Sequence, residues 1–202
     1  MKKLVVIAAT CALFGSATAA LAAGDPAAGK AKSATCAACH SADGNSANPQ
    51  YPKLAGQSEG YLLKQLQDYK GGARVNPIMV GMVAPLSPQD MEDLAAYFSS
   101  QKIARAAADP TLAPAGEAIF RGGNLNSGVS ACMACHGTNG AGIPAAKFPA
   151  IAAQHAEYIE LQLKAFRAME RANDAGQMMR SITGKMTDAE IKAVSSYIQG
   201  LQ

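Results

Sequence analysis

Two pentapeptides determine the fold expected for this chain of 202 residues: Cys36-Ala-Ala-Cys39-His40 and Cys132-Met-Ala-Cys135-His136. In each of them a tight helical turn can present two thiols and one imidazole together. This is the pattern that attaches c-type haem, in which the thiols add to the vinyl groups and the histidine binds the iron. The sequence therefore predicts two haem c groups, with thioether bonds to Cys36, Cys39, Cys132 and Cys135 and iron ligation by His40 and His136.

Three other uses of paired cysteines agree less well with this pattern. A disulfide framework does not explain why histidine follows both pairs. A zinc site needs four ligands in one cluster, but the two pairs lie 96 residues apart with different segments between them. A thioredoxin-like redox motif needs a βαβ context, and no run of β-branched residues supplies one. Haem attachment accounts for the cysteines and the histidines together.

The N-terminus has the pattern of a secretory signal peptide. Basic residues at 2–3 precede an apolar stretch at 4–14 and an A-x-A cleavage site, Ala20-Leu21-Ala22. The apolar stretch is too short to cross a bilayer, although a retained N-terminal anchor is the alternative. Residues 1–22 are therefore predicted to be cleaved, which removes Cys11 and leaves four cysteines. No later segment is long or apolar enough to span a membrane, so we expect an exported, periplasmic protein, with at most a loose association with the membrane surface.

The composition excludes some classes of protein. Hydrophobic residues make up 49% of the chain and charged residues 16%, which argues against long disorder. The formal charge of +3 falls to +1 without the signal peptide and is scattered, so we expect no nucleic-acid binding. Aromatic residues make up only 5%, with no tryptophan, which is little for a self-sufficient core. Two porphyrins would supply the missing apolar volume, because small domains commonly need such a group.

The chain repeats itself. Residues 51–57 match residues 148–154 at an offset of 97, and the offset becomes 100 towards the end of each half. A repeat of this length indicates two homologous domains, each with its own haem. The predicted domains are residues 23–101 and 114–202, and residues 102–113 read as the linker.

The repeat also selects a sixth ligand for each iron. At the offset of 100, Met79 falls on Met179, whereas Met82 and Met178 have no methionine partner. A methionine can be a simple core residue, but preserved register favours Met79 and Met179 as axial ligands. Met82 and Met178 remain the alternatives. His155 has no counterpart in the first half, and we expect it to be an exposed side chain rather than a ligand.

Helical signals occur throughout, and no strand-like alternation is found, so the predicted fold class is all-α. Ser87-Pro88-Gln89-Asp90 and Thr187-Asp188-Ala189-Glu190 are typical starts of helices, and apolar residues follow both at helical spacing. These two would be the closing helices of the halves. The other predicted helices lie near residues 27–35, 59–70, 114–121 and 156–169.

From Gly24 to Leu201 the chain resembles the dihaem cytochrome c4 family, which is built from two tandem class I cytochrome c domains. The resemblance rests on both pentapeptides, on Tyr51-Pro-Lys-Leu-Ala-Gly-Gln57, on Tyr61-Leu-Leu-Lys-Gln-Leu66 and on Ser195-Ser-Tyr-Ile-Gln-Gly200. It implies iron ligation by His40 with Met79 and by His136 with Met179. It also implies that the carbonyls of Pro52 and Pro149 accept the ring N–H of the histidines. The adjacent pair Met178-Met179 leaves open which of the two binds iron.

The resemblance implies a periplasmic carrier of single electrons, with no catalytic residues, rather than an enzyme. Its expected partners are a quinol-oxidising bc-type complex as donor and a haem–copper terminal oxidase as acceptor, although no motif identifies either one. The residues also allow two other functional classes. One is a dihaem peroxidase or small-molecule dehydrogenase with one open haem, and the other is a sensor or structural subunit. The enzyme would need a displaceable ligand and nearby acid–base residues, whereas the two halves offer matching ligands and no recognisable catalytic constellation.

Overall fold

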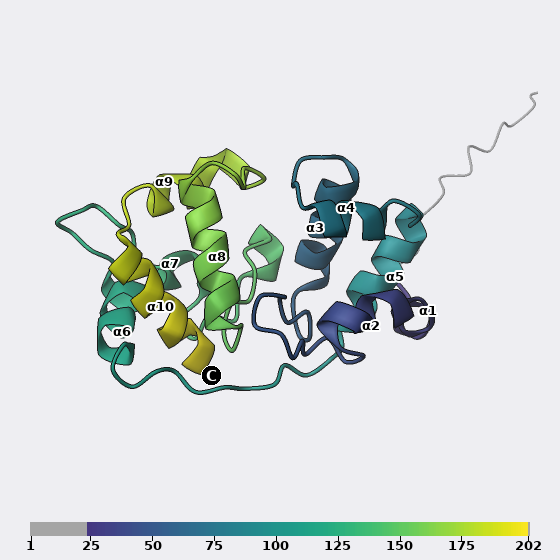
Figure 1. Ribbon diagram of the computed structural model, residues 1–202, viewed down its shortest axis with the longest axis horizontal. Helices are drawn as coiled ribbons and strands as arrows, with labels where there is room; N and C mark the ends of the chain where they lie inside the picture. The colour runs from purple at the N-terminus through teal and green to yellow at the C-terminus, as the bar shows by residue number, and fades with distance from the viewer. Residues whose placement is uncertain (1–23, 202) are drawn as a thin grey trace, which may run out of the picture.

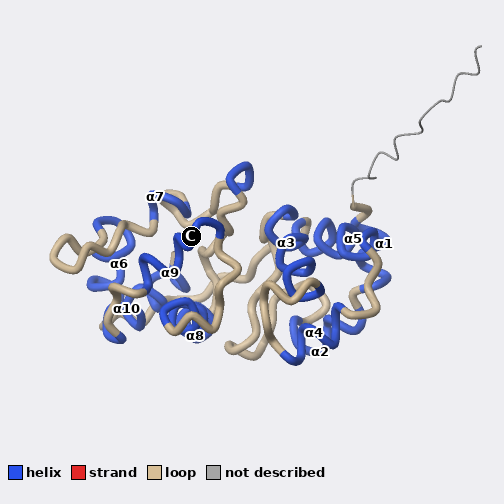
Figure 2. The backbone as a smooth tube through the Cα atoms, turned by 90° about the horizontal axis from the view of Figure 1, so that it is seen from above, coloured by secondary structure: helices blue, strands red, loops and turns tan. Residues whose placement is uncertain are grey.

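The structure, a computed structural model, describes residues 24–201, so the predicted signal peptide lies outside the described residues. Two groups of helices are joined by an extended segment, and the only β pairing in this range is two isolated bridges. Figure 1 shows the groups side by side with the connecting segment along one edge, and Figure 2 shows only helices and loops. The prediction of an all-α fold is confirmed for the described residues.

The N-terminal half contains five α-helices within residues 24–101. The second carries the first pentapeptide, the fourth carries Met79, and the fifth closes the half. In chain order they are α1 (Pro26–Lys32), α2 (Ala34–His40), α3 (Glu59–Lys70), α4 (Pro77–Val83) and α5 (Pro88–Ser99).

The C-terminal half repeats this order with two additional 3-10 turns. Its loop between the first two helices, residues 123–132, is longer than in the N-terminal half and is closed by the bridge between Asn124 and Val129. The elements are α6 (Ala113–Gly122), α7 (Met133–His136), η1 (Pro144–Ala146), α8 (Ala156–Arg167), η2 (Ala175–Gln177), α9 (Met178–Thr183) and α10 (Asp188–Gly200). The repeat found in the sequence is therefore also a repeat of helices.

In each half the opening helix crosses the closing helix at very short range. A Cβ atom on Gly29 of α1 would overlap the carbonyl group of Asp93 in α5. A Cβ atom on Gly116 of α6 would likewise overlap the carbonyl group of Ala193 in α10. Only glycine allows two helix backbones to come this close. The crossing brings the two ends of each half together and leaves the space beside the closing helix for the functional site.

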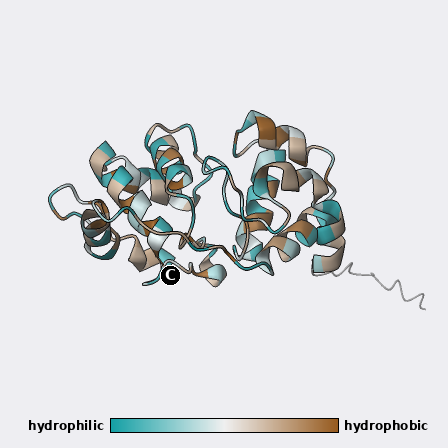
Figure 3. Cartoon of the chain, turned by 60° about the horizontal axis from the view of Figure 1, so that its bottom comes forward, coloured by the Kyte–Doolittle hydropathy of each residue, from teal (hydrophilic) through white to brown (hydrophobic). Residues whose placement is uncertain are grey.

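Both closing helices begin with a capping box, as their sequences indicate. The Asp90 backbone N–H donates to the Ser87 hydroxyl at 3.2 Å, and the Asp90 carboxylate accepts the Ser87 backbone N–H at 2.8 Å. Thr187 and Glu190 make the same pair of contacts in α10. The apolar residues predicted on these helices are buried, and Figure 3 shows hydrophobic residues on the helices of both halves. They are Met91, Leu94, Ala95 and Phe98 in α5, and Ile191, Val194 and Ile198 in α10.

Candidate functional site

Each pentapeptide lies on a short helix that ends at its histidine. In α2 the next residue, Ser41, has φ of 63°, and in α7 the next residue, Gly137, has φ of 81°. These left-handed residues turn the chain away and leave the histidine at the helix end. All four cysteines of the described residues are half-buried, and no disulfide joins them. Burial raises the pKa of the Cys132 thiol to about 11.

Both histidine rings are buried and held in one orientation. Nδ1 of His40 lies 2.9 Å from the carbonyl oxygen of Pro52, and Nδ1 of His136 lies 2.9 Å from that of Pro149. Because a carbonyl oxygen can only accept, the proton is on Nδ1 and Nε2 carries a lone pair. Burial lowers the pKa of both imidazoles, and the carbonyl contact opposes this shift in part. The rings are therefore neutral ligands with one nitrogen available to a metal.

One continuous cavity of about 1120 Å³ runs through both halves. It is lined by both pentapeptides and by apolar side chains of the helices around them. This volume is larger than the roughly 300–1,000 Å³ that a single small-molecule site occupies. Its apolar wall includes Leu62, Leu94, Phe98, Ile159, Val194 and Ile198. Both halves are thus packed around an interior space rather than filled by their own side chains.

The four candidate methionines all line this cavity, from α4 and α9. Met79 and Met179 are half-buried, whereas Met82 and Met178 are exposed by about 40%. The pair selected by the repeat is therefore the better buried pair. The Met79 backbone N–H donates to the Asn76 side chain at 3.0 Å, which caps α4. Helix α9 instead follows two residues with left-handed backbone, Gly176 and Gln177.

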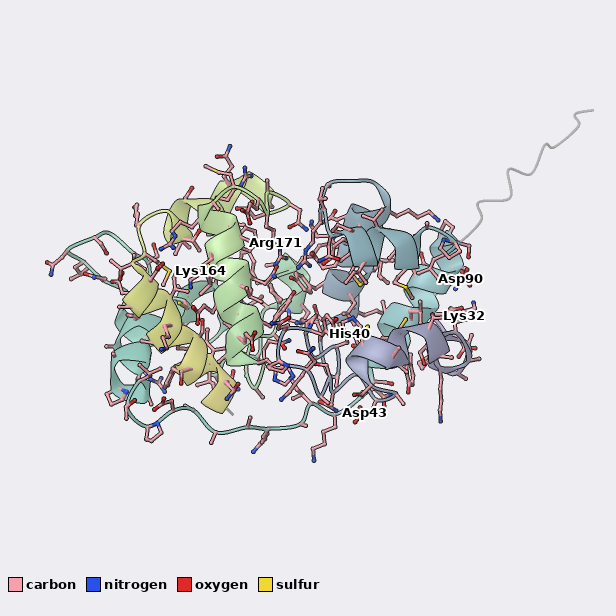
Figure 4. The ribbon with its side chains drawn as sticks, in the orientation of Figure 1. Lys32, His40, Asp43, Asp90, Lys164 and Arg171 are labelled. Carbon is pink, nitrogen blue, oxygen red and sulfur yellow. The ribbon has the colours of Figure 1, made fainter. Side chains whose placement is uncertain are left out.

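Two buried arginines line the same cavity and were not found by sequence reasoning. Arg74 and Arg171 are exposed by only 7% and 8%, and each donates to the side-chain carbonyls of both Gln65 and Gln162, at 2.7 to 3.1 Å. Each guanidinium also donates to a tyrosine hydroxyl of the other half, Arg74 to Tyr158 and Arg171 to Tyr61. Figure 4 shows Arg171 on the side of its half that faces the other half.

The two arginines are also without a neutralising partner among the described residues. Neither forms an ion pair with a carboxylate in the part of the chain that the structure describes. A signal for them was present in the sequence, because their positions correspond at the repeat's offset of 97.

The expectation for His155 was wrong in one respect. This residue is half-buried, and its Nε2 lies 2.8 Å from the carbonyl oxygen of Ser46 and 3.0 Å from the Ser46 hydroxyl. Burial lowers the pKa of its imidazole. The contact joins the two halves across 109 residues, so a single-domain pattern could not reveal it.

These features fit a large apolar cofactor with acidic groups. The cavity wall is apolar, each pentapeptide offers two thiols and a neutral imidazole, and the methionines of α4 and α9 offer thioethers. Two buried cations require anionic partners, because an unpaired charge in a low-dielectric interior costs several kcal/mol. Haem meets all of these conditions, since it combines an apolar ring, an iron centre and two carboxylates.

Comparison with known proteins agrees with this chemistry. The cytochrome c family model matches residues 26–102 and 114–202. Cytochrome c4 of Pseudomonas aeruginosa is 51% identical over 201 residues, which covers 99% of this chain and 98% of that protein. The crystal structure of reduced recombinant cytochrome c4 from Pseudomonas stutzeri superposes with a TM-score of 0.87 at 52% identity. It covers 89% of this chain and 100% of that one. A protein of Thiomonas intermedia named thiosulfate dehydrogenase electron acceptor is 39% identical over 203 residues, 98% of this chain and 90% of its own.

Two matched segments, two attachment motifs and one shared cavity lead to the same conclusion. The chain belongs to the cytochrome c family, as a dihaem protein of the cytochrome c4 type whose two domains each hold one covalently attached haem c.

Proposed function

We propose that this dihaem electron-transfer cytochrome carries single electrons by outer-sphere transfer between complexes of a respiratory chain. The observation that carries the proposal is the matched pair of sites on one cavity. Each half contributes a neutral histidine and a half-buried methionine to the lining of this cavity. The two sites therefore offer the same pair of ligand types, an imidazole and a thioether.

The proposed iron ligands are His40 with Met79 and His136 with Met179. Haem, when bound, supplies reversible one-electron exchange at iron, and a thioether ligand favours the ferrous state. Nε2 of each histidine and Sδ of each methionine would hold the iron and leave no open site on it for oxygen or peroxide. The carbonyls of Pro52 and Pro149 hold each imidazole in one tautomer. The greater burial of Met179 than of Met178 supports Met179 in the second site.

We assign Arg74 and Arg171 to the acidic groups of the cofactors. Buried guanidinium groups bind carboxylates well, because their planar donors match the carboxylate geometry. The two arginines lie between the halves and share Gln65 and Gln162. Their positive charge would balance carboxylates that face the boundary between the two domains.

The proposed domains are residues 23–101 and 114–202, with the linker at 102–113. We also propose a periplasmic location after cleavage of residues 1–22, because this segment has the pattern of a secretory signal peptide. Within residues 24–201, no helix has the length and hydrophobicity that a membrane crossing requires.

The proposed donor is a quinol-oxidising bc-type complex and the proposed acceptor is a haem–copper terminal oxidase. The relative of Thiomonas intermedia suggests a second donor class, since its name describes an acceptor of electrons from thiosulfate dehydrogenase. Stopped-flow reduction of the ferric protein by each donor separates the two. The donor that reduces the ferric protein faster at physiological salt would be assigned as its partner.

The ligand set has a direct spectroscopic test. The ferric protein should show the weak near-infrared band of methionine-ligated haem, at two haems per chain. The reduced protein should not bind carbon monoxide readily at neutral pH. Rapid stoichiometric binding of carbon monoxide at one haem would refute the carrier function and favour a dihaem enzyme.

A further inference from the structure

Two glutamines connect the halves in a reciprocal way. The side-chain carbonyl of Gln154 accepts the backbone N–H of Lys53 at 2.8 Å, and its amide donates to the Lys53 carbonyl at 2.9 Å. Gln57 makes the same two contacts with the backbone of Ala150, at 2.9 Å and 2.7 Å. Gln57 and Gln154 occupy the same position of the repeat. Each half therefore sends one glutamine to the same backbone position of the other half.

The orientation of both side-chain amides is determined. The carbonyl oxygen of Gln154 also accepts the backbone N–H of His155 at 3.1 Å, and that of Gln57 accepts the backbone N–H of Ser58 at 2.9 Å. A flipped amide would place its NH₂ group against two N–H donors, so the alternative orientation is excluded. Both glutamines are buried, exposed by 5% and 8%.

The peptide group that Gln154 contacts is the one that holds the proximal histidine of the N-terminal site. Its carbonyl belongs to Pro52 and accepts the His40 ring N–H at 2.9 Å. Its N–H belongs to Lys53 and donates to Gln154. Since the peptide bond is conjugated, the two ends of this group are electronically coupled. An acceptor at the N–H moves electron density towards the carbonyl oxygen, and consecutive hydrogen bonds strengthen one another in this way.

Gln57 makes the corresponding contact from the N-terminal half to the C-terminal site. The Pro149 carbonyl accepts the His136 ring N–H at 2.9 Å. The N–H of the same peptide group, on Ala150, donates to Gln57. The C-terminal histidine is thus connected to a side chain of the N-terminal half.

From this geometry we infer that Gln154 and Gln57 are positioning residues that each adjust the reduction potential of the haem in the other domain. A better carbonyl acceptor makes the imidazole a stronger donor to iron, which stabilises the ferric state. Each glutamine therefore lowers the potential of the opposite haem. The inference rests on the proposed ligation by His40 and His136. It also means that the two potentials depend on contact between the domains.

The test replaces each glutamine by methionine, which has a similar length and cannot accept the peptide N–H. Redox titration of the intact holoprotein is followed by NMR of haem methyl signals assigned to each domain. Gln154→Met should raise the potential of the N-terminal haem, and Gln57→Met that of the C-terminal haem. We expect about a threefold to tenfold change in the ratio of reduced to oxidised haem at fixed potential; tenfold equals 59 mV for a one-electron couple.

Gln199→Met is the matched control. Gln199 also accepts a backbone N–H, that of Ala156, and donates to a backbone carbonyl, that of Ala107, but it touches neither proximal peptide group. Its replacement should leave both potentials unchanged. The His40 ring N–H signal should move in Gln154→Met and not in the control.

A second variant covers the case in which methionine disturbs folding. Gln154→Glu, when ionised, strengthens the acceptor for the Lys53 N–H and loses the donor to the Lys53 carbonyl. The N-terminal potential should therefore fall more than the C-terminal potential. The inference is overturned if Gln154→Met shifts the C-terminal haem as much as the N-terminal haem, or shifts neither. A wild-type protein without the histidine–methionine spectrum would instead refute the proposed ligation.

Discussion

The two halves form the same helix crossing with different side-chain contacts. In the N-terminal half, Lys32 of α1 pairs with Asp90 and Asp93 of α5 at 2.6 Å and 2.7 Å. In the C-terminal half the position of Asp93 is taken by Ala193, and the crossing of α6 with α10 has an aromatic contact between rings 5.5 Å apart. Both halves keep the glycine of the crossing. Close backbone approach is therefore the shared requirement, and the contacts around it are interchangeable.

The helices that carry the methionines differ as well. Helix α4 has no polar side chain: besides Pro77 and Gly81 it consists of isoleucine, valine and methionine, and Asn76 caps it. Helix α9 is more polar, and the Asp174 carboxylate accepts both the Arg180 backbone N–H at 3.0 Å and its side-chain Nε–H at 2.6 Å. A helix cap holds one methionine in place and a mostly buried ion pair holds the other.

The largest effect should come from the methionines themselves. Met79→Ala and Met179→Ala should each remove the near-infrared band of one haem and lower its potential by on the order of a few hundred mV, because the thioether that favours ferrous iron is lost. Met178→Ala should keep both bands. If Met178→Ala removes a band and Met179→Ala does not, the ligand of the C-terminal site is Met178.

The next largest effect should come from the glycines at the two helix crossings. Gly29→Ala and Gly116→Ala should each destabilise their own half by about 3 kcal/mol, because the new Cβ overlaps a backbone carbonyl that cannot move without separating two helices. Denaturant titration followed at each haem band measures this. Gly60→Ala is the control, since nothing lies within 4 Å of its Cβ position. Equal tolerance of all three substitutions would show that the crossing can relax.

The supports of the methionine helices should differ in strength. Asp174→Ala leaves the Arg180 guanidinium without its partner and should cost about 2 kcal/mol, less than a fully buried pair because the arginine keeps some contact with water. Asn76→Ala removes only a cap and should cost about 1 kcal/mol. The affinity for added imidazole, which competes with methionine for iron, reports both changes. A stronger effect of Asn76→Ala would reverse this comparison.

Acid should affect the two crossings differently. The Asp25 backbone N–H, Lys32 and Gln89 lower the pKa of the Asp93 carboxyl to about 2. The pKa of an aspartate in an unfolded chain is about 3.9. The stabilisation that the ionised Asp93 carboxylate provides is therefore complete above that pH and is lost as the pH falls towards about 2. The stability difference between wild type and Asp93→Asn should therefore shrink over this window in the N-terminal half. Unfolding at each haem band between pH 5 and pH 2 measures it, and a constant difference would contradict the assignment.

Much of the fold could be predicted because its signals are local. Helix α3 has the predicted limits, and the helix predicted at 156–169 ends at Arg167. Both closing helices start at their predicted caps. The short helices α4 and α9 were not predicted, because six or seven residues show no periodicity and a cap or an ion pair with Asp174 supports them.

The contacts between the halves could not be derived in the same way. His155 was expected to be exposed because nothing near it in the sequence indicates its contact with Ser46. Arg74 and Arg171 were missed although the repeat aligns them, because a polar residue in one half gives no sign of burial by the other half. Helix patterns describe each domain, whereas these residues are determined by how two domains meet.

The extended segment between the halves has a consequence for limited proteolysis. Along its length it is bound to both halves: the Ala104 carbonyl accepts from Lys53 and the Ala107 carbonyl accepts from Gln199. Cutting after the exposed Arg105 would break one covalent connection but not the glutamine contacts between the domains. We expect the two fragments to elute together in gel filtration and to separate only in denaturant. The nicked protein would then behave as a non-covalent dimer of two unequal cytochromes.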